Sequence, residues 1–283
     1  YPKDKLNILI VNDGSNDNTS ELLEELMQKF PDLNVINRAR NSGGGKSGAL
    51  NYALKNLDGE WILILDADAK FHADILLRVL PDVIQRGWSA VQLRKAVINS
   101  RNNILTSCQA MEMAMDAMIQ QGRLVAGGVV ELRGNGQLLK RKVLDKCGGF
   151  NEETVTDDLD LSFRLLIAGV SIGILWNPPV EEEAVETFQA LWHQRKRWTE
   201  GGLQRFFDYW KYLISGKVSI FKRIDLISFF LLQYVLPVVS FVDLMTSLIL
   251  QKFPLYWPLS LIAFSVSGLA YFRGCRRKVE GPE

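Results

Sequence analysis

Two aspartates, Asp66 and Asp68, come directly after the apolar run 61–65. Side chains alternate between the two faces of a strand, so these two carboxylates are expected to point into one pocket. A divalent cation, Mg²⁺ or Mn²⁺, would relieve their repulsion and would also bind the diphosphate of a nucleotide-sugar as it leaves. A D-x-D pattern is often only a solvated turn, but its position after a buried strand favours a metal site.

Three glycines at positions 43–45 are followed by Lys46 and Ser47. The run resembles a phosphate-binding P-loop, but that motif requires a glycine at position 40, where the chain has Arg40. We therefore reject a P-loop. The remaining hypothesis is a flexible loop that ends in Lys46 at the start of a helix, where the cation and free backbone amides would meet a phosphate or a uridine oxygen. An ordinary surface loop fits these residues nearly as well.

A second acidic motif, Thr156-Asp157-Asp158, precedes an apolar-periodic run. Thr156 is expected to be the N-cap of a helix whose first turn carries the acidic residues. Such carboxylates are explained by helix capping and by the helix dipole. The same position also suits a general base, because Asp158 would be ionised at neutral pH and could accept a hydroxyl proton as a C–O bond forms.

Gln194, Arg197 and Trp198 have the spacing i, i+3, i+4, so on a helix they project from one face. A guanidinium there can bind pyrophosphate oxygens in a bidentate manner, and an indole can stack on a sugar ring. Arg195 and Lys196 turn to other faces and are expected to meet membrane phosphate groups.

The elements that must position these residues alternate between strand and helix. Strands are expected at 6–11, 34–37, 61–65 and 89–93, and helices from position 18, at 46–57 and at 73–86. This alternation predicts an α/β fold with a mainly parallel sheet covered on both faces. Ligands bind at the carboxyl ends of such strands, where the chain has the polar residues Asn12-Asp13, Asn37-Arg38 and Asp66 to Asp68.

Composition excludes several classes of protein. The chain has 283 residues, 47% of them apolar and 23% charged, so it is neither disordered nor a small disulfide scaffold. A net charge of +1 gives no global field for nucleic acid, and we expect no nucleic-acid partner. Three scattered cysteines without a CxxC pattern, and only two histidines, argue against a zinc site.

The C-terminal part is far more apolar, because residues 226–272 contain only two charges, Asp243 and Lys252. The segments 226–250 and 253–272 are each long enough to cross about 30 Å of hydrocarbon, which predicts two transmembrane helices. A pair of buried core helices is the alternative. Basic residues dominate 195–223 and recur after the second segment, at Arg273, Arg276, Arg277 and Lys278. Both flanks are therefore expected to be cytoplasmic, and the protein to be a multi-pass membrane protein.

A further amphipathic pattern precedes the apolar segments. Apolar residues recur at helical spacing, with polar residues opposite, at Leu203, Phe206, Phe207, Trp210, Leu213 and Ile214. We expect a helix in the membrane interface; packing of the same face against the soluble domain is the alternative. The expected division is a catalytic domain at 1–200, an interfacial helix and basic linker at 201–223, two transmembrane helices at 224–272 and a basic cytoplasmic tail at 273–283.

Six ordered motifs together resemble those of the membrane-embedded inverting family-2 glycosyltransferases. They are Asn12 to Ser15, Gly45 to Asn51, Asp66 to Asp68, Gly134 to Gly136, Thr156 to Asp158 and Gln194 to Trp198. The resemblance implies a GT-A fold. In cellulose-synthase-like members the fifth motif reads T-E-D, so this chain departs by Asp157, and Asp158 matches the catalytic base.

Carried over to this chain, the resemblance implies a role for each matching residue. Asp13 and Asp66 would hold uridine and ribose, and Lys46 would help at the nucleotide. Asp68 would bind the metal and Asp158 would deprotonate the acceptor hydroxyl. Pyrophosphate and acceptor would be enclosed by Asp157, Gln194, Arg197 and Trp198. A single in-line displacement on a UDP-α-sugar would give a β-linked product.

Within the family, the motifs at 156–161, 192–202 and 208–210 are similar to those of the cyanobacterial β-monoglucosyldiacylglycerol synthases. This similarity implies a UDP-glucose donor and a diacylglycerol acceptor, reached from the cytoplasmic face. An interfacial helix with a basic flank fits a membrane-borne acceptor and contact with membrane lipid. Family members begin with an additional strand bearing a P-x-N-E-like segment, and this chain is expected to start after that strand.

Two other functions remain open at this point. A processive synthase of a β-linked polysaccharide, such as poly-N-acetylglucosamine or a glucan, would need a transmembrane channel that two helices cannot form alone. A non-catalytic module that binds nucleotide-sugar would have no need for the base Asp158.

Overall fold

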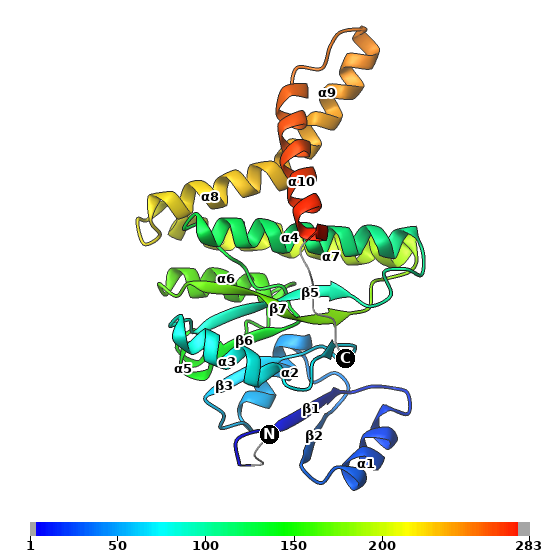
Figure 1. The fold of residues 1–283 in the computed structure, drawn as a ribbon, viewed down its shortest axis with the longest axis vertical. Helices are drawn as coiled ribbons and strands as arrows, with labels where there is room; N and C mark the ends of the chain where they lie inside the picture. The colour runs from blue at the N-terminus through cyan, green and yellow to red at the C-terminus, as the bar shows by residue number, and fades with distance from the viewer. Residues whose placement is uncertain (1–3, 277–283) are drawn as a thin grey trace.

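The computed structural model describes residues 4–276 of the chain, and its lower part is an α/β domain (Figure 1). Residues 1–3, and Arg277 and Lys278 of the expected basic tail, lie outside the described residues. The elements of this domain up to the second long helix are β1 (Ile8–Asp13), α1 (Thr19–Lys29), β2 (Leu33–Arg38), α2 (Gly45–Leu54), β3 (Trp61–Ile64), β4 (Lys70–Phe71), α3 (Ile75–Gln85), β5 (Ala90–Val97), α4 (Ile104–Val125), β6 (Gln137–Lys140), α5 (Arg141–Lys146), α6 (Asp157–Ile167), β7 (Ile172–Glu182) and α7 (Phe188–Ile214).

The expected alternation of strands and helices is confirmed, but the expected mainly parallel sheet is wrong. Among the described residues, β1 and β2 form a parallel pair, and the main sheet has the order β3-β6-β5-β7-β4. Only β5 and β7 are parallel in it; β3 with β6, β5 with β6, and β4 with β7 are antiparallel. The mixed sheet arises because three strands that we did not expect take places in it: β6 runs antiparallel between β3 and β5, β7 lies parallel to β5, and β4 lies antiparallel to β7 at the edge.

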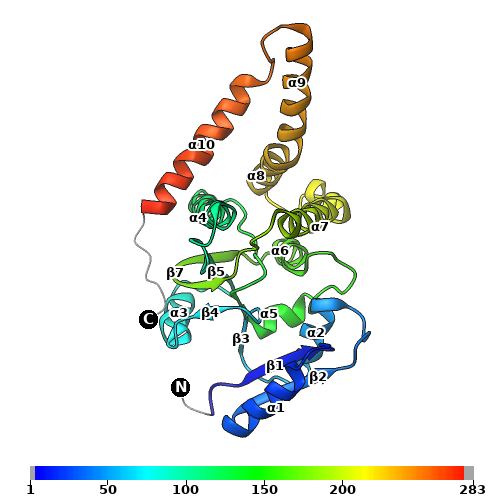
Figure 2. The same ribbon diagram turned by 90° about the vertical axis from the view of Figure 1, so that its right-hand side faces the viewer.

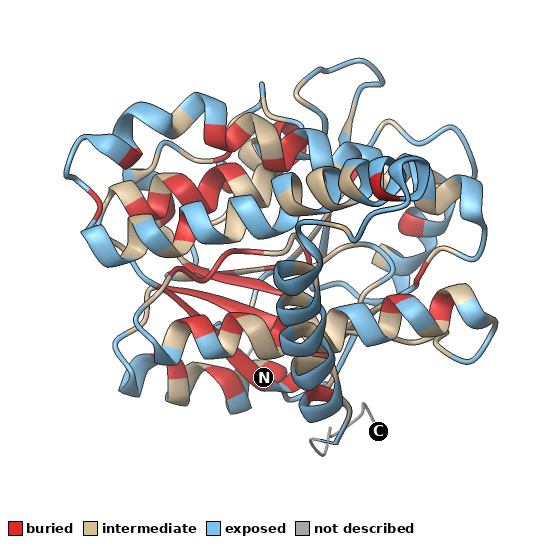
Figure 3. Cartoon of the chain, turned by 90° about the horizontal axis from the view of Figure 1, so that it is seen from above, coloured by how far each residue is buried: buried red, intermediate tan, exposed pale blue. Residues whose placement is uncertain are grey.

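Two long helices, α4 and α7, lie side by side over the sheet, with α6 below α7 (Figure 2). The start of α4 is defined by a capping box, in which Thr106 N–H donates to the side chain of Asn103 at 2.9 Å and Thr106 Oγ1 accepts from Asn103 N–H at 3.1 Å. Thr187 caps α7 in the same manner through the amide of Ala190 at 3.3 Å. Buried residues concentrate on the strands and on the helix faces turned toward them (Figure 3).

The boundary expected between positions 200 and 201 falls inside α7, which continues without interruption from Phe188 to Ile214. Part of its apolar face packs against the α/β domain, as the alternative interpretation held, and contact of the remainder with a membrane stays a prediction. Phe206 and Leu213 are buried in a cluster with Phe163 of α6. In contrast, Phe207 and Trp210 are 68% and 50% exposed. The helix therefore packs on the domain with one edge and presents an apolar edge outward.

Helices rise from the domain at the end of the described chain. They are α8 (Ile220–Phe230), a π-helical turn η1 (Leu231–Val235), α9 (Leu236–Leu250) and α10 (Trp257–Arg276). The first three form one continuous helix, Ile220–Leu250, which is 31 residues long, has a mean hydropathy of 1.9 and is 6% buried over its most apolar stretch. In α10, by contrast, serines and the arginines Arg273 and Arg276 dilute the apolar residues.

Within residues 4–276, Ile220–Leu250 is the one helix that is both long and apolar enough to cross a membrane, where we expected two. Its exposure contradicts the alternative of a buried core helix. Helix α10 returns antiparallel to α9 toward the domain (Figures 1 and 2). The hydroxyls of Ser240 and Ser260 lie 2.8 Å apart and join the two helices.

Candidate functional site

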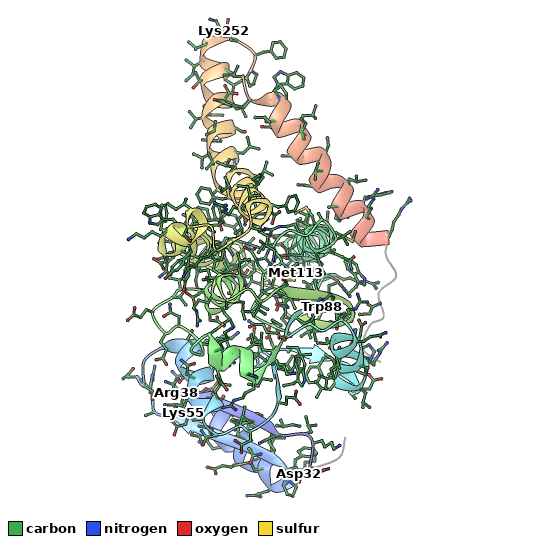
Figure 4. The ribbon with its side chains drawn as sticks, turned by 90° about the vertical axis from the view of Figure 1, so that its left-hand side faces the viewer. Asp32, Arg38, Lys55, Trp88, Met113 and Lys252 are labelled. Carbon is green, nitrogen blue, oxygen red and sulfur yellow. The ribbon has the colours of Figure 1, made fainter. Side chains whose placement is uncertain are left out.

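A cavity of about 360 Å³ lies between the sheet, α6, α7 and the π-helical turn. It brings together eight of the nine residues selected from the sequence, which are Lys46, Asp66, Asp68, Asp157, Asp158, Gln194, Arg197 and Trp198. The expected convergence of positions 66, 68, 158 and 197 is therefore observed. Met113 of α4 also lines this cavity and is labelled among the side chains above the sheet in Figure 4.

Asp13 is the predicted site residue that does not line the cavity. It ends β1, and its carboxylate pairs with Arg38 of β2 at 2.6 Å. The same guanidinium donates to the carbonyl of Gly43 at 2.9 Å. Arg38 lies far below Met113 in Figure 4, toward the β1–β2 end of the molecule. In this structure Asp13 therefore helps to position the glycine loop.

Lys46 is in the first turn of α2, which begins after Gly44 in the left-handed conformation at φ 71°. Its ammonium group pairs with the carboxylate of Asp66. Burial alone would lower the pKa of Lys46, but the carboxylates of Asp157 and Asp66 outweigh it and raise that pKa above its ordinary value. The ammonium group therefore stays charged, and Asp66 is not a free carboxylate.

Asp66 and Asp68 lie in a turn after β3 rather than in the strand. The amide of Ala69 donates to the carbonyl of Asp66 at 3.0 Å, and this turn, rather than strand alternation, brings both carboxylates to the cavity. Asp66 N–H donates to Asn135 Oδ1 at 3.2 Å. Asp68 is exposed and accepts a hydrogen bond from the amide of Glu183 at 3.3 Å.

The carboxylates fit an open cation site that a substrate would complete. Among residues 4–276, no group of three or more histidine, cysteine, aspartate or glutamate side chains is arranged to hold a metal ion. Mg²⁺ is usually bound through one or two carboxylates together with water and substrate phosphates, so a closed cage is not required. The exposed Asp68 at the cavity matches that donor set.

Asp157 and Asp158 occupy the first turn of α6, with Thr156 as the N-cap residue. Burial, and then the charge of Asp158, raise the pKa of Asp157 to about 6. Burial also raises the pKa of Asp158, opposed first by the guanidinium of Arg133 and then by a hydrogen bond from the amide of Leu159 and by Lys95. A carboxylate with a raised pKa is a stronger base than an exposed aspartate, which suits proton abstraction.

We expected the side chain of Thr156 to cap α6, but it forms no cap hydrogen bond. Its hydroxyl instead packs on the backbone of α7 at Gly201, where any side chain would clash with it. Within the described part of the chain, three buried oxygens near the cavity lack a hydrogen-bond partner: Thr156 Oγ1, Asp157 Oδ2 and Gln194 Oε1. Buried polar atoms normally have partners, so these oxygens are available to accept a hydrogen bond from a ligand or a water molecule.

Helix α7 supplies the wall opposite the carboxylates. Gln194, Arg197 and Trp198 all line the cavity, as their spacing predicts. Arg195, which we expected to face lipid, instead binds Glu112 of α4 through two hydrogen bonds of 2.8 and 2.6 Å. Its guanidinium carbon lies 4.4 Å from the centre of the Trp198 ring, so this ion pair fixes the indole as well as the helix pair.

Arg133 is a cavity residue that the sequence reasoning missed. It binds Asp116 in a bidentate manner at 3.0 and 2.9 Å and donates to Glu131 at 3.1 Å. Glu131 is fully buried and also pairs with Arg205 of α7 at 2.8 Å. These two arginines, together with Arg123 at 3.8 Å, lower the pKa of Glu131 despite its burial. The signal was available in the sequence, because Glu131 and Arg133 alternate with apolar residues in a run that is otherwise typical of a core.

The chain is similar to known proteins over most of its length. Residues 1–201 match the family described as "Glycosyltransferase like family 2". The chain is 47% identical over 277 residues to a β-monoglucosyldiacylglycerol synthase of Synechocystis and 43% identical to one of Trichormus variabilis. Each alignment covers 98% of this chain, but only 58% and 59% of those relatives.

A solved mannosyltransferase from Pyrobaculum calidifontis, in complex with GDP-Man and Mn²⁺, superposes with a TM-score of 0.54 at 18% identity. The superposition covers 98% of this chain and 79% of that one, and it supports the GT-A fold. The match over 201 residues shows the family directly. The chain belongs to glycosyltransferase family 2.

Proposed function

We propose that the protein is an inverting glycosyltransferase that moves glucose from UDP-glucose to the hydroxyl of diacylglycerol and so produces β-monoglucosyldiacylglycerol. The observation that carries the proposal is the convergence of Lys46, Asp66, Asp68, Asp158 and Arg197 around one cavity. The donor and acceptor are inferred from the two relatives named above, which share 47% and 43% identity with this chain.

The donor side of the site is formed by groups from α2 and the turn after β3. Asp66 and Lys46 would bind the nucleotide, and Asp13 would act at the uridine end, through the glycine loop that its ion pair with Arg38 holds. Asp68 would hold Mg²⁺ or Mn²⁺. When bound, such a cation supplies positive charge that stabilises the leaving diphosphate. Arg197 can bind the same diphosphate in a bidentate manner.

The acceptor side is formed by α6 and α7. Asp158 would accept the proton of the acceptor hydroxyl while its oxygen attacks the anomeric carbon from the face opposite the diphosphate. The bond between that carbon and the phosphate oxygen breaks, UDP leaves, and the configuration inverts from α to β. Asp157, Gln194 and Trp198 would enclose the reacting groups; the orphaned oxygens of Asp157 and Gln194 are suited to this role.

The membrane arrangement is part of the proposal. Residues 231–250 would cross the bilayer, since 20 helical residues span about 30 Å. We propose that α10 is the second crossing, because it runs back beside α9 and ends against α4, where a side chain at Gly274 would meet the carbonyl of Ala114. The catalytic domain would then lie on the cytoplasmic face, with the exposed residues of α7 toward the lipid surface.

The test uses membranes that contain the protein, incubated with labelled UDP-glucose or UDP-N-acetylglucosamine. We expect chloroform-soluble label from UDP-glucose. We expect Asp158→Asn to lower transfer by about 10²- to 10⁴-fold and to leave UDP binding intact. Asp58→Asn, an exposed aspartate outside the cavity lining, is the matched control and should transfer normally.

Three outcomes would contradict the proposal. Ethanol-insoluble label in place of lipid-soluble label would indicate a processive polysaccharide synthase. Unchanged turnover by Asp158→Asn would remove the assigned base. UDP binding without transfer by the wild-type protein would indicate a module that only binds nucleotide-sugar.

A further inference from the structure

The helix Ile220–Leu250 departs from regular α-helical geometry at the point where it passes the cavity. Residues Leu231–Val235 form a π-helical turn, in which the amide of Leu236 donates to the carbonyl of Leu231, five residues earlier. Pro237 explains the interruption, because it has no N–H to donate to the carbonyl of Gln233 and its ring crowds that carbonyl. Such wide turns inside helices are often found at functional sites.

The π-helical turn contributes two polar side chains, Gln233 and Tyr234, to the same cavity as the catalytic carboxylates. Tyr234 is held by aromatic packing, with its ring centre 5.4 Å from that of Phe230 and 6.5 Å from that of Phe206. Its hydroxyl reaches the backbone of α7 at Gly202, where any side chain would overlap it. The bare backbone at Gly202 is therefore what lets the phenol enter the cavity.

The position of this pair separates it from the donor groups. Lys46 and Asp66 enter the cavity from α2 and the turn after β3, below α7, whereas the π-helical turn lies at the junction of α8 and α9, above it (Figure 2). Asp158 and Trp198 also line this cavity, and the helices that carry them, α6 and α7, lie between α2 and the junction of α8 and α9 (Figure 2). A substrate that enters from the side of the π-helical turn therefore meets Tyr234 and Gln233 first and the base afterwards.

We propose that Gln233 and Tyr234 form the acceptor subsite, which binds the glycerol end of a membrane lipid and directs its free hydroxyl to Asp158. This inference rests on the proposed function and names the residues that select its acceptor. The phenol oxygen accepts a hydrogen bond from Arg205, so its O–H is left to donate to a lipid oxygen, and the glutamine amide can donate to an ester carbonyl. The helix that bears them is apolar and exposed over most of its length, so the subsite opens where a lipid headgroup lies.

The experiment measures donor and acceptor steps separately, in membranes containing the protein with added dioleoylglycerol and labelled UDP-glucose. Tyr234→Phe keeps the ring packing and removes only the hydroxyl. We expect this variant and Gln233→Ala each to raise the KM for dioleoylglycerol by about threefold to tenfold, the effect of losing one hydrogen bond. The KM for UDP-glucose, and the slow hydrolysis of UDP-glucose without acceptor, should remain at wild-type values.

Tyr212→Phe is the matched control, because Tyr212 is a tyrosine of α7 outside the cavity lining. It should leave both KM values unchanged. If the wild type transfers glucose normally and both subsite variants keep the wild-type KM for dioleoylglycerol, the subsite assignment is wrong. The proposed function would still stand. Equal losses in donor hydrolysis and lipid transfer would show a structural role and also overturn the subsite assignment. Absence of lipid-soluble product from the wild type would overturn the proposed function, and the subsite with it.

Discussion

The proposed base works only if its charge is controlled by its neighbours. Asp158 is partly buried, and this burial raises the pKa of its carboxyl and so favours the protonated acid. Arg133 opposes this effect with a guanidinium held by Asp116 and Glu131. A base with a pKa just below the working pH combines ionisation with high proton affinity. At the residue scale, the missed Arg133 therefore matters as much as the expected carboxylates, as a positioning and charge-tuning residue.

This balance predicts a pH dependence. Asp158 must be ionised to accept a proton, so transfer is present above its pKa and is lost as the pH falls through it. Removing the positive charge in Arg133→Gln should raise that pKa further and move the acid limb of kcat/KM upward by about one pH unit. Arg133→Lys should restore much of the wild-type profile.

The matched control for this profile is Arg86→Gln, because Arg86 is 53% exposed on its side chain, lies outside the cavity lining and pairs with Asp82 of α3. Its acid limb should coincide with that of the wild type. A profile of Arg133→Gln that also coincides with the wild type would show that Arg133 does not set the charge of the base.

At the scale of elements, α7 organises the site because it is approached closely from two sides. Thr156, at the start of α6, packs on Gly201, and Tyr234 of the π-helical turn packs on Gly202. The two adjacent glycines thus allow both α6, which carries Asp158, and the π-helical turn to pack closely against α7. Helix α7 carries Gln194, Arg197 and Trp198. Both glycines are buried.

Gly201→Ala should therefore destabilise the fold although alanine favours helices. The added methyl group would overlap the Thr156 side chain and force α6 away, at a cost of about 1–3 kcal/mol in the free energy of unfolding. The measurement is thermal unfolding in detergent, together with transfer activity, which should fall as Asp158 moves. The matched control is Gly122→Ala in α4, where a side chain would meet open space. We expect that substitution to increase the free energy of unfolding by up to about 1 kcal/mol. A similar increase for Gly201→Ala would contradict the close approach of Thr156 to Gly201.

Local pattern was sufficient for most elements and for most of the site. Apolar runs predicted β1 and β3, and helical spacing predicted that Gln194, Arg197 and Trp198 share a face, because both signals depend on neighbours along the chain. The sheet order could not be predicted in this way. Gln137–Lys140 is too short to show a period, and its antiparallel place between β3 and β5 is decided by long-range packing. The same limit applies to Asp13, whose ion pair with Arg38 spans two strands.

At the scale of the whole molecule, the cavity lies between the soluble domain and the helices that rise from it. Arg123 of α4 binds Asp225 of α8 at 2.8 Å, and the same arginine lies 4.4 Å from the ring centre of Phe229. The carboxylate of Asp225 also accepts from the amide of Val129 at 2.8 Å. These contacts fix the base of the rising helix to the α/β domain, so in the proposed membrane arrangement the site would be held at a constant height relative to the bilayer.

This fixed geometry predicts the side on which each end of the helical hairpin lies. Phe253, 91% exposed in the turn between α9 and α10, should lie across the membrane from the catalytic domain. In a background where Cys108, Cys147 and Cys275 are replaced by alanine, Phe253→Cys should react with a membrane-impermeant thiol reagent from the outer side of intact cells. Lys29→Cys, on the exposed side of α1, is the control and should react only after the cells are opened. Labelling of both positions only in opened cells would mean that α9 and α10 do not cross the bilayer, and that the protein reaches its lipid acceptor from the interface alone.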